Sequence, residues 1–225
     1  MHRCIVKSAT YGQSSVARPD LHDIDPLNRW LARQNRLRLD AEIIRDVALA
    51  ASGQLDSALG GPPVQPPQPA GLGAFTQANR EWVASTGGHR VRRAIYTRIQ
   101  RATLHPALAV FDAPDSFTTC TRRLRSNTPL QALTLLNDTQ FHELAQQIAR
   151  QLATAPGSET DRIAAGFFRC TARRPAPEET RTLLRLLREE GSSGGTGTRS
   201  DAPPESGWLA VARVLLNLDE TLTRE

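Results

Sequence analysis

The sequence predicts a mainly α-helical protein, an irregular helical bundle with long connecting loops rich in proline and glycine. Three observations support this fold class. Apolar residues recur at spacings of three and four along several segments, which is typical of amphipathic helices. Proline- and glycine-rich stretches separate those segments. No run of alternating apolar and polar residues is long enough to indicate a strand. With 225 residues, the chain can also bury a substantial core.

The most clearly signalled helix begins after Thr128. The Thr128 hydroxyl can accept a hydrogen bond from an otherwise unpaired backbone N–H, and Pro129 occupies the first helical position, where its missing N–H costs nothing. Gln131 lies three residues after Thr128 and completes a capping box. An apolar face follows at a spacing of three, made by Leu130, Leu133 and Leu136.

Asp138 interrupts this apolar run and can cap a further helix. Apolar residues follow it at three-to-four spacing, namely Phe141, Leu144, Ala145, Ile148 and Leu152. The stretch 128–153 therefore predicts either one kinked helix or two consecutive helices.

Helices are predicted on both sides of this stretch. One covers residues 37–51, with Asp40 as its N-cap and Gly53 just after its end. Its charged residues are expected on a solvated or salt-bridged face: Glu42, Arg45 and Asp46. The other predicted helices cover 91–104, with a basic outer face, and then 161–170, 177–187 and 208–218.

Two stretches are too rich in glycine, proline and serine for a helix or a central strand. Residues 60–73 favour extended polyproline geometry, and residues 191–207 are typical of a flexible loop. The first stretch is either a surface loop that crosses the bundle or a loop that binds a partner or ligand. We therefore expect one helical domain over residues 1–225, with flexible loops at about 60–75 and 191–207.

Charged and polar residues gather before the Thr128 helix and at its start. A turn carries two aspartates, and three arginines follow it. Guanidinium groups near carboxylates favour bidentate pairs. The cluster is either a set of structural ion pairs that fastens a loop to the bundle, or a pocket that binds an anion or a sugar. Its members are Asp112, Asp115, Arg122, Arg123, Arg125, Asn127 and Gln131.

The sequence leaves open whether the protein is an enzyme. It contains no G-x-S-x-G, P-loop or H-E-x-x-H motif. Asp112, Asp115 and Glu220 are carboxylates that could act on polysaccharide, but glycoside chemistry requires defined separations between them. The competing hypothesis is a non-catalytic structural or interaction module.

The net charge of +5 is modest, and acidic residues are interleaved with the arginines. Because there is no dense basic tract, no nucleic-acid partner is predicted. The histidines and cysteines lack metal-ligand spacing, so no metal site is expected, whereas a Cys120–Cys170 disulfide stays open. No apolar run is long enough to span a membrane, and residues 1–15 lack the apolar core of a signal peptide.

Short motifs along nearly the whole chain resemble those of a known family. Each is weak alone, and together they are specific. They include Ser8-Ala9-Thr10-Tyr11, Arg38-Leu39-Asp40-Ala41-Glu42, Phe111-Asp112-Ala113-Pro114, residues 126–138 and residues 215–220. The chain resembles the PSD module, a C-terminal domain of unknown function found in planctomycete proteins associated with cytochrome c.

The resemblance implies an exported or periplasmic multidomain protein, of which this chain would be a C-terminal fragment. Its partners would be the N-terminal domains of its own parent chain, with polysaccharide as another candidate. Haem is implied only for those upstream regions, so no cofactor is expected in this chain. Aromatic residues of the family are replaced here, at Pro67, Gly73, Val91, Arg98 and Ile99, which weakens the sugar-binding interpretation.

Overall fold

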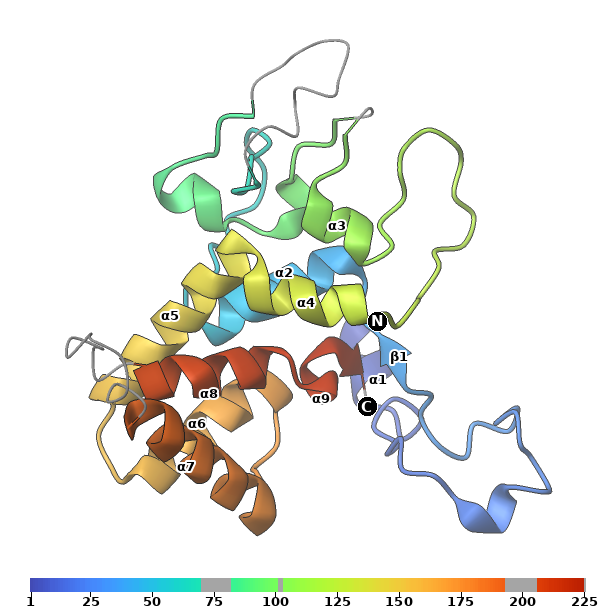
Figure 1. The fold of residues 1–225 in the computed structure, drawn as a ribbon. Helices are drawn as coiled ribbons and strands as arrows, with labels where there is room; N and C mark the ends of the chain where they lie inside the picture. Colours follow the sequence, from blue (N-terminus) through green and yellow to red (C-terminus); the bar gives the residue numbers. More distant parts are fainter. Residues whose placement is uncertain (70–81, 101–102, 193–205, 225) are drawn as a thin grey trace.

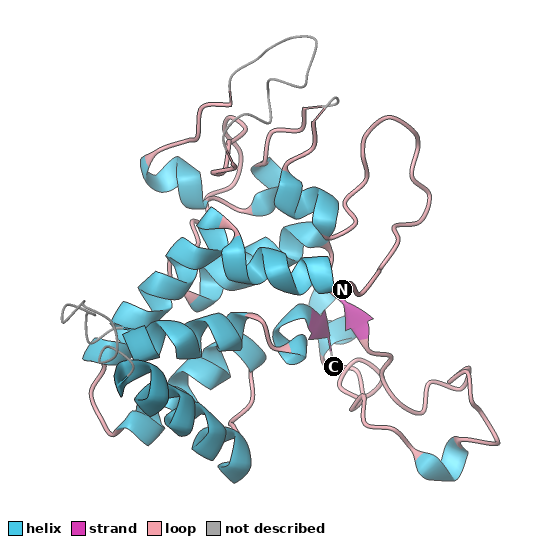
Figure 2. Cartoon of the chain, viewed as in Figure 1, coloured by secondary structure: helices cyan, strands magenta, loops and turns pink. Residues whose placement is uncertain are grey.

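The structure is a computed structural model that describes residues 1–69, 82–100, 103–192 and 206–224 (Figure 1). Helices dominate these ranges, which confirms the mainly α fold class (Figure 2). Two short strands, β1 (Leu37–Arg38) and β2 (Thr223–Arg224), pair antiparallel with Leu37 opposite Arg224. Residues 70–75 and 193–205 of the two loops expected to be flexible lie outside the described ranges.

The C-terminal helices build the core. Helix α8 (Ser206–Leu216) packs against both α5 (Thr139–Thr154) and α7 (Pro177–Ser192), and α6 (Glu159–Thr171) contacts all three. Amphipathic spacing aims the apolar side of each helix inward. The side chains buried between these helices include Ile148, Leu152, Ile163, Phe167, Val211 and Leu215.

Two glycines allow these helices to approach closely. A Cβ atom at Gly207 of α8 would lie 2.3 Å from the backbone oxygen of Leu187 in α7. One at Gly166 of α6 would lie 2.9 Å from the Leu152 side chain of α5. Any larger residue at either position would have to move its neighbour.

The predicted break after Asn137 is a boundary between two helices. Helix α4 covers Pro129–Asn137 and begins with the capping box of Thr128 and Gln131. Asp138 is extended, and its side chain accepts hydrogen bonds from the N–H groups of Gln140 and Phe141 at the start of α5. Of the two alternatives left open by the sequence, the structure has two consecutive helices.

Helix α2 covers Ala41–Ala51, so it starts after Asp40 as expected, while Leu37 belongs to β1. Its charged residues were predicted on a solvated or salt-bridged face. Two of them are not solvated, and one of these two, Asp46, forms an ion pair with Arg93. Arg45 and Asp46 are buried, with 4% and 8% of their surface exposed. Glu42 is salt-bridged as predicted, to Arg123.

The predicted basic helix at 91–104 is wrong within the residues that the structure describes there. Short 3₁₀ turns at Gly87–Val91 and Ala94–Tyr96 replace it, and the α-helix α3 (Pro106–Val110) comes only afterwards. The cause lies in the buried charges of α2. The Arg45 guanidinium donates to the carbonyl oxygens of Arg90 and Arg92, and the Asp46 carboxylate accepts from the Ala94 N–H. These backbone groups are thereby paired outside any helix.

Arg92, expected on the outer face of that helix, is buried instead. Its guanidinium donates to the carbonyl oxygens of Gly60 and Pro62 and lies 4.0 Å from the centre of the Tyr96 ring. Val64 also pairs with Thr97 in a parallel bridge. The described part of the proline-rich loop is therefore packed onto the body.

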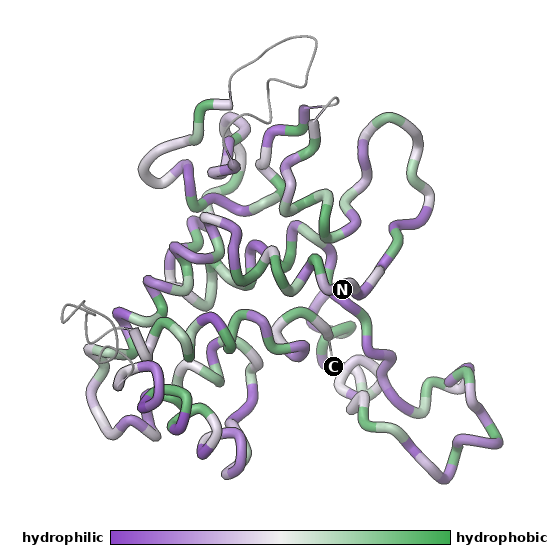
Figure 3. Tube along the Cα trace, viewed as in Figure 1, coloured by the Kyte–Doolittle hydropathy of each residue, from purple (hydrophilic) through white to green (hydrophobic). Residues whose placement is uncertain are grey.

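Residues 1–36 form an arm, most of which extends away from the helical body, while the N-terminus lies near β1 in this view (Figure 1). It contains the short helix α1 (His2–Val6) and a 3₁₀ turn at Pro19–Leu21, and it joins the body at β1. Asn28 is the one residue of the arm that is buried. Several green, hydrophobic stretches nevertheless lie along it (Figure 3). Most of the arm's large apolar side chains are exposed.

Candidate functional site

The candidate site starts at Asp112, which follows α3 in the left-handed conformation with φ of 62°. Its carboxylate accepts hydrogen bonds from the Ser126 N–H at 2.8 Å and from the Ser126 hydroxyl at 2.8 and 3.0 Å. Residues 112 and 126 thus close the loop that leads from α3 to α4. Ser126 was not among the predicted site residues.

The cation that neutralises Asp112 is Arg38 of β1 rather than any of the three predicted arginines. The Arg38 side chain is 8% exposed and that of Asp112 is 19% exposed. The same guanidinium donates to the carbonyl oxygens of Ser126 at 2.8 Å, Leu39 at 3.0 Å and Phe111 at 3.3 Å. Arg38 therefore fastens the loop, α3 and β1 to one another.

Gln131 completes this network from the first turn of α4. Its amide nitrogen donates to the Ser126 hydroxyl at 3.1 Å and to the carbonyl oxygen of Val110 at 3.0 Å. Its amide oxygen accepts from the Thr128 N–H at 3.3 Å. Of the seven predicted residues, Asp112 and Gln131 are thus joined through Ser126.

Burial raises the pKa of Asp112, but hydrogen bonds from Ser126 and the charge of Arg38 outweigh it. The pKa of this carboxyl therefore lies below its ordinary value, and Asp112 is ionised at neutral pH. An ionised carboxylate that is occupied by three donor groups is suited to holding structure, and poorly suited to donating a proton.

Arg123 and Arg125 contact α2 instead of the two aspartates of the turn. The Arg123 guanidinium binds both oxygens of Glu42, at 2.7 and 3.1 Å. Arg125 lies 3.6 Å from Asp40, the N-cap of α2. Arg123 lowers the pKa of Glu42 by hydrogen bonding, against the opposing effect of burial. These pairs fasten the end of the loop to α2.

The remaining predicted residues play a smaller part. The Asp115 carboxylate accepts from the Phe117 N–H at 3.0 Å, which is a local turn contact. No hydrogen bond or ion pair joins the Arg122 or Asn127 side chain to the described part of the chain. Asp112, Asp115, Arg122 and Arg123 do line one open depression of about 480 Å³ beneath residues 118–124.

Glu220, the third carboxylate considered, belongs to a separate cluster. The Arg173 guanidinium binds Glu220 at 2.6 and 2.7 Å and Glu179 at 2.7 and 2.8 Å. Hydrogen bonds that Arg173 donates to these two carboxylates raise the pKa of Arg173. The cluster therefore joins the turn after α6 to α7 and α9 (Asp219–Leu222).

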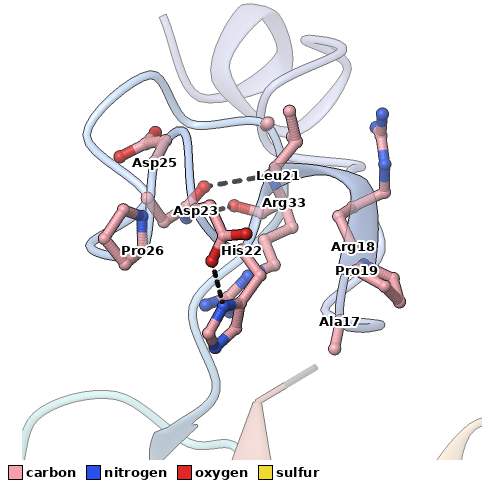
Figure 4. Close-up of a pocket in the computed structure, with 11 residues that line it drawn as sticks. Ala17, Arg18, Pro19, Leu21, His22, Asp23, Asp25, Pro26 and Arg33 are labelled. Carbon is pink, nitrogen blue, oxygen red and sulfur yellow. Dashed lines mark hydrogen bonds and ion pairs between the residues drawn. The ribbon is translucent and has the colours of Figure 1, made fainter.

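The arm contains a hollow of its own, of about 470 Å³ (Figure 4). Its lining includes Arg18, His22, Asp23 and Arg33, and the His22 ring lies 3.0 Å from the Asp23 carboxylate. In the described ranges, His, Cys, Asp and Glu side chains do not gather in threes that could hold a metal ion. All three cysteines are free thiols, with Cys170 buried and Cys4 and Cys120 exposed.

The fold and its charged networks define a helical domain in which arginine–carboxylate contacts fasten loops to the body. A comparison with protein-family models shows which family this domain belongs to. Residues 1–187 match the PSD1 family, described as "Protein of unknown function (DUF1553)", and the chain belongs to that family. Comparisons with curated proteins and with solved structures give no match. None of the helices in the described residues is both long and apolar enough to cross a bilayer.

Proposed function

We propose that this chain is a structural and interaction module of an exported multidomain protein associated with cytochrome c. The observation that carries the proposal is the exposure of large apolar side chains along an ordered arm. Soluble monomers rarely expose contiguous apolar patches unless the patch binds a partner. The exposed arm residues are Ile5, Val6, Tyr11, Val16, Ile24, Leu27, Trp30 and Leu31.

The charged cluster supports the same proposal. Asp112, Arg123, Arg125 and Gln131 all contact other parts of the fold, so their role is to hold the loop in place. The partner of the arm is a surface of the parent protein, as the family resemblance implies. Haem, where the parent protein carries it, belongs to a different region of that protein.

The test is a photo-cross-linker placed at Trp30 in the full gene product. Adducts at position 30 are expected to map, by mass spectrometry, to peptides of the same gene product. The matched control carries the cross-linker at Phe117, which is 64% exposed against 71% for Trp30. Equal yields at the two positions, or adducts spread over unrelated proteins, would contradict the contact role.

A second candidate function rests on the depression beneath residues 118–124. Arg122 and three threonines, at positions 118, 119 and 121, are among the residues that line it. A guanidinium beside hydroxyl groups is suited to an anion or an acidic polysaccharide. Binding is favoured over hydrolysis, because Arg38 and Ser126 already occupy the Asp112 carboxylate.

Titration with dextran sulfate, followed by thermal unfolding, tests this second function. The expected result is a rise in the midpoint that Arg122→Ala abolishes. Arg150→Ala removes an exposed arginine from α5 and serves as the control. If both variants respond alike, the rise reflects general charge attraction and the site is rejected.

A further inference from the structure

Trp30 lies on a turn that the arm builds and holds. The Asp25 carboxylate accepts hydrogen bonds from the N–H groups of Arg29 and Trp30, each at 2.8 Å. The buried Asn28 donates its side-chain amide to the carbonyl oxygen of Arg33 at 2.7 Å and to Asn35 at 3.0 Å. The backbone that carries Trp30 is therefore fixed from both sides.

This turn presents its largest side chain to solvent, with 71% of Trp30 and 52% of Leu31 exposed. Asn28 and Leu31 adopt the left-handed conformation, with φ of 49° and 54°. Such residues persist where the surrounding contacts hold them. A tryptophan on a preorganised turn loses little conformational freedom on binding, which is a property of interface anchors. We call residues 25–35 the Trp30 turn.

An apolar pocket of about 260 Å³ opens between α7 and α8. Phe167, Leu183, Val214 and Leu218 supply its apolar lining, and Val214 is 37% exposed. Glu178 and Glu179 lie at its edge in the first turn of α7. Glu179 is already paired with Arg173, whereas Glu178 has no ion pair within the described residues, so the free acid at the edge of this apolar hollow is Glu178. A volume of about 260 Å³ suits one large side chain.

The Trp30 turn is the charge complement of this pocket. Arg29, next to Trp30, is exposed. An apolar ring beside the Arg29 guanidinium matches an apolar hollow with the Glu178 carboxylate at its edge. In the structure, Trp30 is exposed and the pocket is open, so the two complementary features of one chain do not fill each other.

We propose that the Trp30 turn of one copy of this chain inserts into the α7–α8 pocket of a second copy. The exchange is reciprocal, because the second copy returns its own turn to the first, and the resulting dimer is closed. This inference rests on the proposed contact role of the arm and names its partner. Two identical contacts form together, so each one raises the effective concentration of the other.

Sedimentation velocity over about a hundredfold range of protein concentration tests the proposal. A tenfold change in the dissociation constant equals about 1.4 kcal/mol. The wild-type chain is expected to show a monomer–dimer equilibrium. Trp30→Ser and Val214→Glu should each raise the dissociation constant at least tenfold, since loss of a central anchor costs about 2 kcal/mol or more. Phe117→Ser, which removes an exposed aromatic ring outside both features, should leave the constant unchanged.

Mixing the two defective variants separates this arrangement from other dimers. Trp30→Ser keeps an intact pocket and Val214→Glu keeps an intact arm, so a mixture retains one complete contact and should associate more tightly than either alone. Arg29→Glu should weaken the dimer, and Arg29→Glu combined with Glu178→Arg should restore it. Circular dichroism melts confirm that each variant is folded.

Several results would overturn the inference: a wild-type chain that stays monomeric, an equal effect of Phe117→Ser, or a mixture that does not associate. If the wild-type chain is monomeric while the cross-linker at position 30 still reaches another region of the same gene product, the contact role stands and the second-copy partner is wrong. If that cross-linker also gives no adduct, both proposals fail.

Discussion

Arg38 is the residue on which the loop network depends. It supplies the positive charge beside Asp112 and donates to three backbone carbonyl groups around it. Removing it leaves a partly buried carboxylate without its cation and three carbonyl groups without a donor. Such a loss costs far more than the loss of an exposed pair.

We therefore predict that Arg38→Ala lowers the free energy of unfolding by about 3–5 kcal/mol, as for other broken buried ion pairs. Urea denaturation measures the change. Arg18→Ala, which removes the exposed Arg18–Asp20 pair, is the control and should have no measurable effect. Equal behaviour of the two variants would show that Arg38 does not hold the loop.

The depressed pKa of Asp112 predicts a pH dependence. In the unfolded chain an aspartate has a pKa of about 3.9. Because its folded pKa is lower, the folded state binds fewer protons, so the stabilisation is present above about pH 4 and is lost as the pH falls further. The difference in unfolding free energy between wild type and Asp112→Asn should narrow below about pH 4. A difference that is constant down to about pH 2.5 would rule out this linkage.

The cysteines provide a third prediction at this scale. Burial raises the pKa of Cys170 to about 12, so its thiolate is scarce at neutral pH. A thiol reagent should modify Cys4 and Cys120 in the folded protein and reach Cys170 only after denaturation. Fast reaction of Cys170 in the folded protein would contradict the buried position on α6.

Residue-scale prediction from the sequence succeeded where the contact is local. The capping box of Thr128 and Gln131 and the cap at Asp138 span three residues, and both are in the structure. The partner of Asp112 could not be predicted, because Arg38 lies 74 positions earlier in the chain. The arginines nearest in sequence were the natural candidates, and the fold carries two of them to α2 instead.

At the scale of elements, the approach of α7 and α8 depends on Gly207. A methyl group there would lie 2.3 Å from the Leu187 backbone oxygen, which cannot move without shifting α7. We predict that Gly207→Ala destabilises the protein by about 1–3 kcal/mol through overpacking. Gly191→Ala is the control, because its Cβ would meet nothing within 4 Å. The measurement is the midpoint of thermal unfolding of each variant. Similar midpoints would show that α7 and α8 do not pack closely enough at Gly207 to exclude a methyl group.

The predicted helix at 91–104 illustrates why some elements could not be predicted. Its spacing of apolar and basic residues is compatible with an amphipathic helix. The sequence does not reveal that Arg45 and Asp46 of α2 would bind its backbone, nor that Arg92 would turn inward to Gly60 and Pro62. Buried charges must be paired, and here the pairing determined the backbone.

At the scale of the whole molecule, the arm is mostly exposed. Of residues 1–36 only Asn28 is buried, and the ion pair of Arg36 with Asp219 is exposed. We predict that deletion of residues 1–36 leaves the helical circular dichroism signal and a single cooperative unfolding transition. Loss of cooperative unfolding would mean that the body needs the arm to fold. The same deletion should abolish the proposed dimer.

The two-residue ribbon of β1 and β2 is the mechanical link between arm and body. Leu37 pairs with Arg224 in antiparallel register. A force that pulls the arm and the last residues apart would therefore break the residue pairs of the ribbon one after the other, starting with Leu37 and Arg224. Beyond the ribbon, the next bond in line is that from the Leu39 N–H to the Leu222 carbonyl, 2.7 Å long, which leads into α9. When the arm and the last residues are pulled apart, the hydrogen bonds between β1 and β2 should break first, while the helices stay folded.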